Sequence, residues 1–155
     1  MAFDDFWNRL LNAGKTALRV EGALGIDQTT PGTTNGVQAA NPLSAVAATI
    51  ANGESLSIGL DLGAGRVLCA IDMPADWDTA GLTFQASAVL DGVYDDLYDQ
   101  YGTEKTVTAA ADRYISLDDP AVWLGVRYLK VRSGTSGTAV NQTAARTIQL
   151  ITKPV

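Results

Sequence analysis

Histidine is missing from the 155-residue chain, and cysteine occurs only once, at position 69. Without histidine, Ser-His-Asp and Cys-His catalysis and the histidine-containing zinc sites are excluded. A lone cysteine cannot form an intrachain disulfide, and the apolar neighbours Val67, Leu68 and Ile71 predict that Cys69 is a small buried side chain rather than a reactive thiol. We therefore expect a protein that is not an enzyme and that carries no cofactor or metal ion.

Long apolar runs and an excess of basic charge are also missing. No segment approaches the roughly 20 apolar residues that span a bilayer, and Asp4 and Asp5 stand where a signal peptide would carry lysine or arginine. The 17 acidic and 11 basic residues give a net charge of −6, which repels phosphate backbones. We expect no membrane or nucleic-acid partner, and a product that is made in the cytosol and stays soluble.

The composition favours short strands over helices. The chain is 46% hydrophobic, enough to bury a core, and its 15 glycines are typical of strands joined by tight turns. From residue 43 onward, strand patterns recur every 8 to 15 residues or so, as in two-sheet proteins. The predicted strands cover residues 47–50, 54–62, 66–73, 82–88, 93–98, 105–109, 113–117, 126–132 and 147–152. Residues 43–155 are therefore expected to form an all-β domain, an antiparallel, jelly-roll-like β-sandwich.

Local patterns refine this prediction. Residues 54–62 alternate, with Leu56, Ile58, Leu60 and Leu62 on one predicted face. The glycines of residues 63–65 lie between two strands, with no helix to follow, and so indicate a hairpin turn and not a nucleotide loop. Residues 118–124 suggest a turn or one helical turn that places Trp123 at one end of the core. Trp77 is expected to close the other end, with ligand stacking as the alternative.

Residues 1–42 differ from the rest and are predicted to be an N-terminal helix and anchoring arm. Residues 3–12 have the spacing of a short amphipathic helix, and the glycine-, threonine- and proline-rich arm that follows has only isolated apolar residues. The candidate anchoring residues are Phe3, Phe6, Trp7, Leu10, Leu11, Leu18 and Val20. A helix this short needs a surface to dock on. Two alternatives are a helix packed on its own domain and an arm that is a plain flexible linker.

A run of aspartates and tyrosines between residues 91 and 104 is the main candidate for ligand binding. Together with Trp77 it suggests a ligand rim, in which aromatic rings stack on sugars and carboxylates accept their hydroxyl groups. The rim residues are Trp77, Asp91, Tyr94, Asp95, Tyr98 and Asp99. The aspartates lack the EF-hand spacing, so a solvated acidic rim is favoured over a calcium site, and no carboxylate pair stands out for a glycosidase.

Positive charge gathers toward the C-terminal strands, at Arg127, Lys130, Arg132 and Arg146. Its sign is opposite to that of the aspartate-rich run, so the two regions could pair neighbouring subunits. Scattered surface charge is the simpler interpretation.

Five short blocks occur in an order that resembles a known family. They read DMPADW at 72–77, LTFQAS at 82–87, DLYD at 96–99, YLKVRSGT at 128–135 and VNQ at 140–142. The blocks resemble small virion structural proteins of tailed bacteriophages, over roughly residues 52 to 153.

The resemblance implies a β-sandwich module that decorates or cements a capsid or forms a head fibre, often as a dimer or trimer. Its partners would be the major capsid protein or other virion proteins, and its location the virion, assembled in the host cytoplasm. The competing hypothesis is a carbohydrate-binding module or a receptor-binding fibre head that recognises host-surface glycans.

Overall fold

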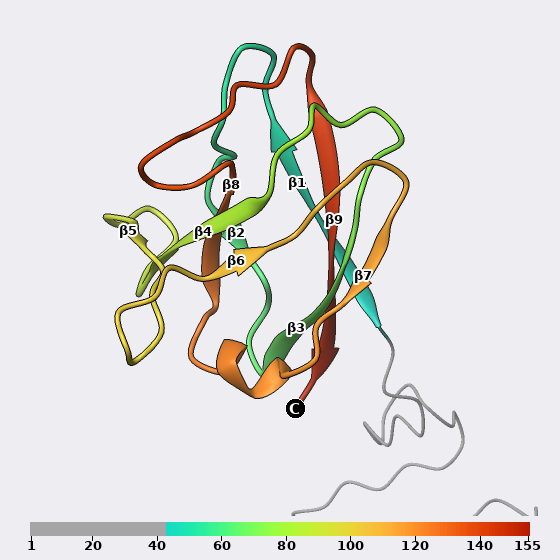
Figure 1. The fold of residues 1–155 in the computed structure, drawn as a ribbon. Helices are drawn as coiled ribbons and strands as arrows, with labels where there is room; N and C mark the ends of the chain where they lie inside the picture. Colours follow the sequence, from blue (N-terminus) through green and yellow to red (C-terminus); the bar gives the residue numbers. More distant parts are fainter. Residues whose placement is uncertain (1–42) are drawn as a thin grey trace, which may run out of the picture. The chain divides into compact units, whose positions relative to one another are not determined.

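The computed structural model describes residues 43–155, and this part of the chain is all-β, as predicted (Figure 1). Its only helix is a single 3₁₀ turn. The elements are β1 (Ser44–Ile50), β2 (Leu60–Asp61), β3 (Arg66–Asp72), β4 (Leu82–Ser87), β5 (Asp95–Asp96), β6 (Thr106–Val107), β7 (Tyr114–Ser116), η1 (Pro120–Trp123), β8 (Tyr128–Ser133) and β9 (Arg146–Pro154). Each predicted strand has a counterpart, although several are shorter. The predicted N-terminal helix, the arm and their seven anchoring residues lie outside the described residues.

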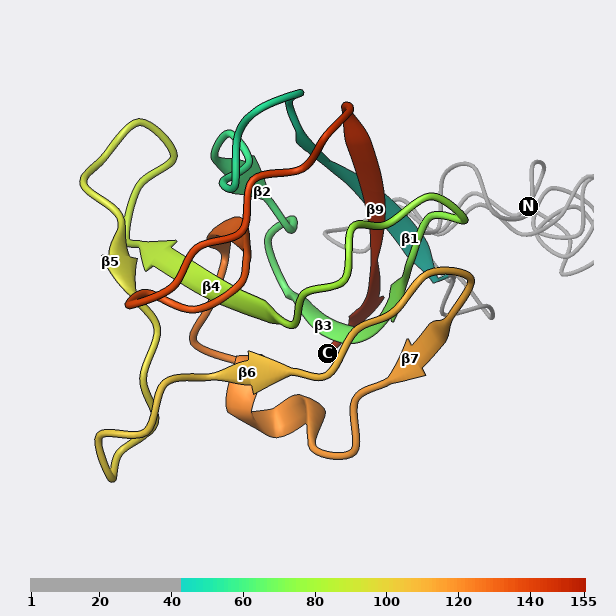
Figure 2. The ribbon, with the colours of Figure 1, turned by 45° about the horizontal axis from the view of Figure 1, so that its top comes forward.

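The strands form two antiparallel sheets. Sheet A has the order β1-β9-β3-β7, and sheet B has the order β2-β8-β4-β5. β8 pairs with one side of β4 along its whole length, while β6 and β5 pair in turn with its other side, at Leu82–Thr83 and Gln85–Ala86. Figure 2 shows β4 and β5 on one side of the domain and β9 and β1 on the other.

The pairings are nested along the chain. β1 pairs with β9, β2 with β8, and β3 with β7, and the innermost strand β4 pairs with β5 and β6. Two further ladders, β3 with β9 and β4 with β8, join these pairs into the two sheets. Sheet A therefore contains the outermost and the third pair, and sheet B contains the second and the innermost.

One hydrophobic core draws on both sheets. Ile50, Leu68 and Leu150 come from sheet A, and Phe84 and Leu129 from sheet B, and all are fully buried. Burying such a side chain contributes about 1.5 to 3 kcal/mol relative to leaving it in water. The core is thus what holds the domain together.

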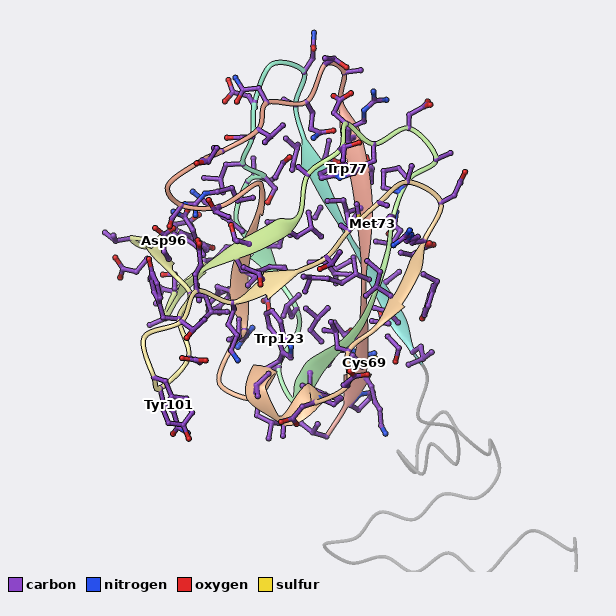
Figure 3. The ribbon with its side chains drawn as sticks, viewed as in Figure 1. Cys69, Met73, Trp77, Asp96, Tyr101 and Trp123 are labelled. Carbon is purple, nitrogen blue, oxygen red and sulfur yellow. The ribbon has the colours of Figure 1, made fainter. Side chains whose placement is uncertain are left out.

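Both predicted tryptophan caps belong to this core. Trp123 is the last residue of the 3₁₀ turn, in which the Asp119 carboxylate accepts a hydrogen bond from the Ala121 N–H, and it packs edge-on against Phe84 at 4.9 Å between ring centroids. Figure 3 shows Trp123 near η1 and Trp77 toward the opposite end of the strands. Trp77 is only 8% exposed, and its indole N–H donates to the Ala80 carbonyl at 3.0 Å. The core-cap prediction is confirmed for both rings.

The alternation predicted for residues 54–62 is wrong at its centre. Ile58 is 74% exposed, whereas Ser57 is 4% exposed. The Ser57 hydroxyl accepts a hydrogen bond from the Val131 N–H and donates one to the Ile58 carbonyl, both at 2.9 Å. These bonds satisfy the inward-facing hydroxyl, so Ser57 takes the inward place and Ile58 turns out.

Cys69 is partly exposed, not buried as predicted. The pairing of β3 with β9 shifts register between Leu68 and Ala70, so Cys69 is the extra residue of a bulge. Its thiol donates to the Ile151 carbonyl at 3.3 Å. The bulge breaks the in-and-out alternation of β3 at this residue.

Candidate functional site

The predicted ligand rim is divided by the fold. Trp77 is a core residue and is not part of a ligand rim, because its indole is buried and hydrogen-bonded within its own loop. The other five rim residues lie in the connection of residues 88–105, which leaves β4, forms β5 and returns to β6. They occupy different places along this connection, and only Tyr98 and Asp99 among them line a common pocket.

Tyr94 packs onto the outer face of sheet B. Its hydroxyl donates to the Leu90 carbonyl at 2.8 Å, and the Lys130 ammonium lies 4.6 Å from its ring centroid. Gly59 makes room for it, since a Cβ there would stand 2.4 Å from the phenol oxygen. Burial raises the pKa of the Tyr94 phenol, and the negative charge of Asp91 raises it further. One face of this ring is therefore covered by a cation of the same chain and is closed to a ligand.

Asp96 belongs to an ion-pair network on the same face. Its carboxylate pairs with the Arg132 guanidinium and accepts from the Gln85 amide at 3.0 Å, and Arg132 also lies 3.5 Å from Glu104. The hydrogen bond from Gln85, followed by that from Arg132, lowers the pKa of Asp96. Asp95, its neighbour in β5, is exposed. The network ties β5 and the returning chain to the central strands of sheet B.

The other basic residues singled out from the sequence also have partners within the chain. Arg127 donates two hydrogen bonds of 2.9 Å to Asp61 and stands over the Tyr128 ring, 4.9 Å from its centroid. Its hydrogen bond lowers the pKa of Asp61. Arg146 lies 3.8 Å from both Asp76 and Asp78. Both arginines therefore have acidic partners within their own chain.

Tyr98 and Asp99 are the two rim residues that the fold brings into one pocket. Asp99 shapes the turn beside it by accepting from the Tyr101 and Thr103 N–H groups, both at 2.9 Å, and the Thr103 bond lowers its pKa. The pocket has a volume of about 210 Å³. It is lined by Leu97, Tyr98, Asp99, Gln100, Lys105, Val122 and Trp123. Polar groups beside an apolar floor are typical of sites for small polar ligands.

A second hollow was not anticipated. It has a volume of about 520 Å³ and lies between residues 79–83, residues 106–109 and the loop 134–140. Threonines contribute much of its lining, including Thr83, whose hydroxyl donates to the Gly134 carbonyl at 2.9 Å. Three distant segments form it, so no local sequence pattern could have revealed it.

Over residues 43–155, no three histidine, cysteine, aspartate or glutamate side chains group as metal ligands would. The aspartates considered for calcium are separated, since Asp96 faces Arg132 and Asp99 caps its own turn. No helix in the described part of the chain is long and apolar enough to cross a membrane.

Comparisons with known proteins complete the description of the site. No protein-family model, no curated protein and no solved structure matches the chain. The function is therefore argued from the fold, the surfaces described above and the sequence blocks.

Proposed function

We propose that the chain is a non-enzymatic structural protein of a tailed-phage virion, a capsid decoration or cement protein. In this proposal residues 43–155 form a jelly-roll-like β-sandwich displayed on the particle, and residues 1–42 anchor it to the major capsid protein or another virion protein. The protein would act as a dimer or trimer on a virion assembled in the host cytoplasm.

The nested strand pairing is the observation that carries this proposal. β5 and β6 pair with the same side of β4 and are counted here as one strand. The strands then form four antiparallel pairs, nested one inside the next like a single long hairpin. Wrapping that hairpin so that alternate pairs join produces two four-membered sheets, which is the arrangement of β1-β9-β3-β7 and β2-β8-β4-β5. This strand order supports a jelly roll, an architecture that is common in viral capsid and lectin domains. The ordered sequence blocks that resemble phage virion proteins favour the first of these classes.

The anchoring role rests on the composition of the N-terminal segment. Phe3, Phe6, Trp7, Leu10 and Leu11 place five large apolar side chains within nine positions. A short segment of this kind gains stability by docking its apolar residues on a partner, and aromatic side chains are favoured at such contacts. The domain of residues 43–155 has its own core and does not need the segment to bury it.

The test compares binding of the full chain and of a chain without residues 1–40 to heads of the encoding phage that lack the protein. We expect the full chain to co-sediment with the heads and the shortened chain to stay in solution with an unchanged unfolding temperature. Phe6→Ser combined with Trp7→Ser should weaken binding at least tenfold. Leu124→Ser is the control, because Leu124 is an exposed apolar residue of the domain itself. Equal binding by the full and shortened chains contradicts the anchoring role.

The alternative function is binding of host-surface glycans, and the pocket beside Tyr98 is the observation that favours it. The Tyr98 side chain is 48% exposed, so part of it is free to contact a sugar. A glycan array on the full chain tests this alternative, with Tyr98→Ala as the site variant. Tyr114→Ala is the matched control, since Tyr114 is 60% exposed but lies on β7. Selective binding that only Tyr98→Ala abolishes supports a glycan-binding module; no selective binding favours the decoration protein.

A further inference from the structure

The free edges of the two sheets are not alike. Within the described residues, sheet A ends at β1 and β7, and sheet B ends at β2 and at the β5–β6 side of β4. β2, β5 and β6 have two residues each, and β7 has three, whereas β1 has seven. An exposed edge offers unpaired N–H and C=O groups to other chains, and proteins commonly protect edges by keeping them short. Every edge except β1 has this protection.

β1 also lacks the other usual forms of protection. It reads Ser-Ala-Val-Ala-Ala-Thr-Ile, with no charged residue and no proline. It pairs with β9 residue for residue from Ser44 to Ile50, so no bulge twists it away. By contrast, β5 consists of two aspartates and β2 includes Asp61. Among the described edges, that of β1 is therefore the best suited to pair with a strand of another chain.

We propose that β1 pairs with β1 of a second copy of this chain. A two-fold axis perpendicular to the sheet makes the two strands antiparallel, which continues the pairing that sheet A already uses. The joined sheet has the order β7-β3-β9-β1-β1-β9-β3-β7. This interface does not depend on the proposed function, since a capsid protein or a sugar-binding module can use it equally.

The residues of β1 suit contact with themselves. Copies with a net charge of −6 repel one another, and an uncharged strand opposes no like charges in any register. Its outward-facing side chains Ala45, Ala47 and Thr49 are small and exposed, so they allow close approach. A strand of seven residues is roughly 24 Å long, and such a pair alone buries less than the 1,200 Å² or so of a stable interface. We therefore expect association in the micromolar range.

The experiment measures the mass of the full chain by sedimentation from about 1 to 200 µM, a range set by the expected affinity. We expect a monomer–dimer equilibrium that Ala47→Lys weakens at least tenfold. Ser116→Lys is the matched control because it adds the same charge at an exposed position on β7, the opposite edge of sheet A. Both variants should keep the unfolding temperature of the original chain. Hydrogen exchange of the unmodified chain adds a measurement without a variant: amides of residues 44–50 should gain protection as concentration rises.

Several results would overturn the interface. A chain that stays monomeric at the highest concentration would contradict pairing through β1. Association that Ala47→Lys and Ser116→Lys weaken equally would contradict it too, as would hydrogen exchange in β1 that does not change with concentration. Dimers that disappear on deletion of residues 1–40 but survive Ala47→Lys assign the contact to the N-terminal segment, which also overturns pairing through β1.

Discussion

The outer faces of the two sheets differ in what occupies them. On sheet B, the connection of residues 88–105 folds back over the strands, and Tyr94, Asp96 and Arg132 meet partners from the same chain. On sheet A, the outward positions of β1 carry Ala45, Ala47 and Thr49, and the Thr49 hydroxyl is hydrogen-bonded to that of the exposed Thr147 of β9, at 2.9 Å. The outer face of sheet B is thus covered in part by its own chain, whereas the outward positions of β1 on sheet A carry small, uncharged and exposed side chains. This contrast supports the proposal that β1, at the edge of sheet A, contacts a second copy of the chain.

The largest loss of unfolding free energy is expected for Arg132→Ala, which tests the outer face of sheet B. Arg132 is 8% exposed, and its removal leaves Asp96 and Glu104 without their cation. Leaving such groups unpaired should cost about 2 to 3 kcal/mol of unfolding free energy. Gln149→Ala, at an outward position of sheet A, should change it by less than about 0.5 kcal/mol. Chemical denaturation measures both, and equal losses would mean that the faces do not differ.

The next effect tests how tightly the connection packs on sheet B. In Gly59→Ala the added methyl collides with the Tyr94 ring, so we expect a loss of about 1 to 2 kcal/mol. Tyr94→Phe removes the phenol oxygen that lies closest and should recover part of that loss in the double variant. Gly125→Ala is the control, since nothing lies within 4 Å of a Cβ there. A strictly additive double variant would contradict the contact.

A smaller effect follows from the lowered pKa of Asp96. A carboxyl group whose folded-state pKa lies below its ordinary value of 3.8 stabilises the folded state above that pH. This contribution is lost as the pH falls through the folded-state pKa. The stability difference between the original chain and Asp96→Asn should therefore be full above about pH 5 and narrow below about pH 4. Unfolding temperatures across this range measure it, with Asp95→Asn as the exposed control, and a constant difference would refute the linkage.

The smallest effect is expected on the open face. Thr49→Ala removes an exposed hydroxyl contact between β1 and β9, and such cross-strand pairs contribute about 0.2 to 1 kcal/mol. We expect a loss near the lower end of this range, because water replaces the lost partner. Denaturation midpoints measure it. A loss as large as that of Arg132→Ala would erase the distinction between the two faces.

Much of the fold was predictable from local patterns, because alternation and turn residues act over a few positions. The strands, the single helical turn and the burial of Trp123 all follow from short stretches of sequence. Ser57 and Ile58 were assigned to the wrong faces because the deciding hydrogen bonds come from Val131, far along the chain.

The site was less predictable because its contacts join distant residues. Asp96 and Arg132 are 36 positions apart, and no local pattern shows that they meet. Trp77 was placed in the rim because an aromatic residue in a loop has the same sequence signal whether its ring faces solvent or the core. Tyr98 and Asp99 do share a pocket, but η1 supplies its opposite wall. The sequence therefore predicted which segment contributes to the pocket, but not the distant residues that this segment contacts.

The position of β9 has a consequence for how the chain is made. β9 is synthesised after the other eight strands, yet it lies between β1 and β3, and the Thr152 hydroxyl reaches the Ser44 carbonyl across 108 positions of sequence. At ordinary translation rates β1 therefore waits on the order of 5 to 20 s for its partner. Throughout that delay both edges of β1, which has no charged residue, lack a partner strand, while other copies of the chain emerge from neighbouring ribosomes. The strand that we propose to join finished copies is thus also the one that has to be kept apart from other copies during synthesis.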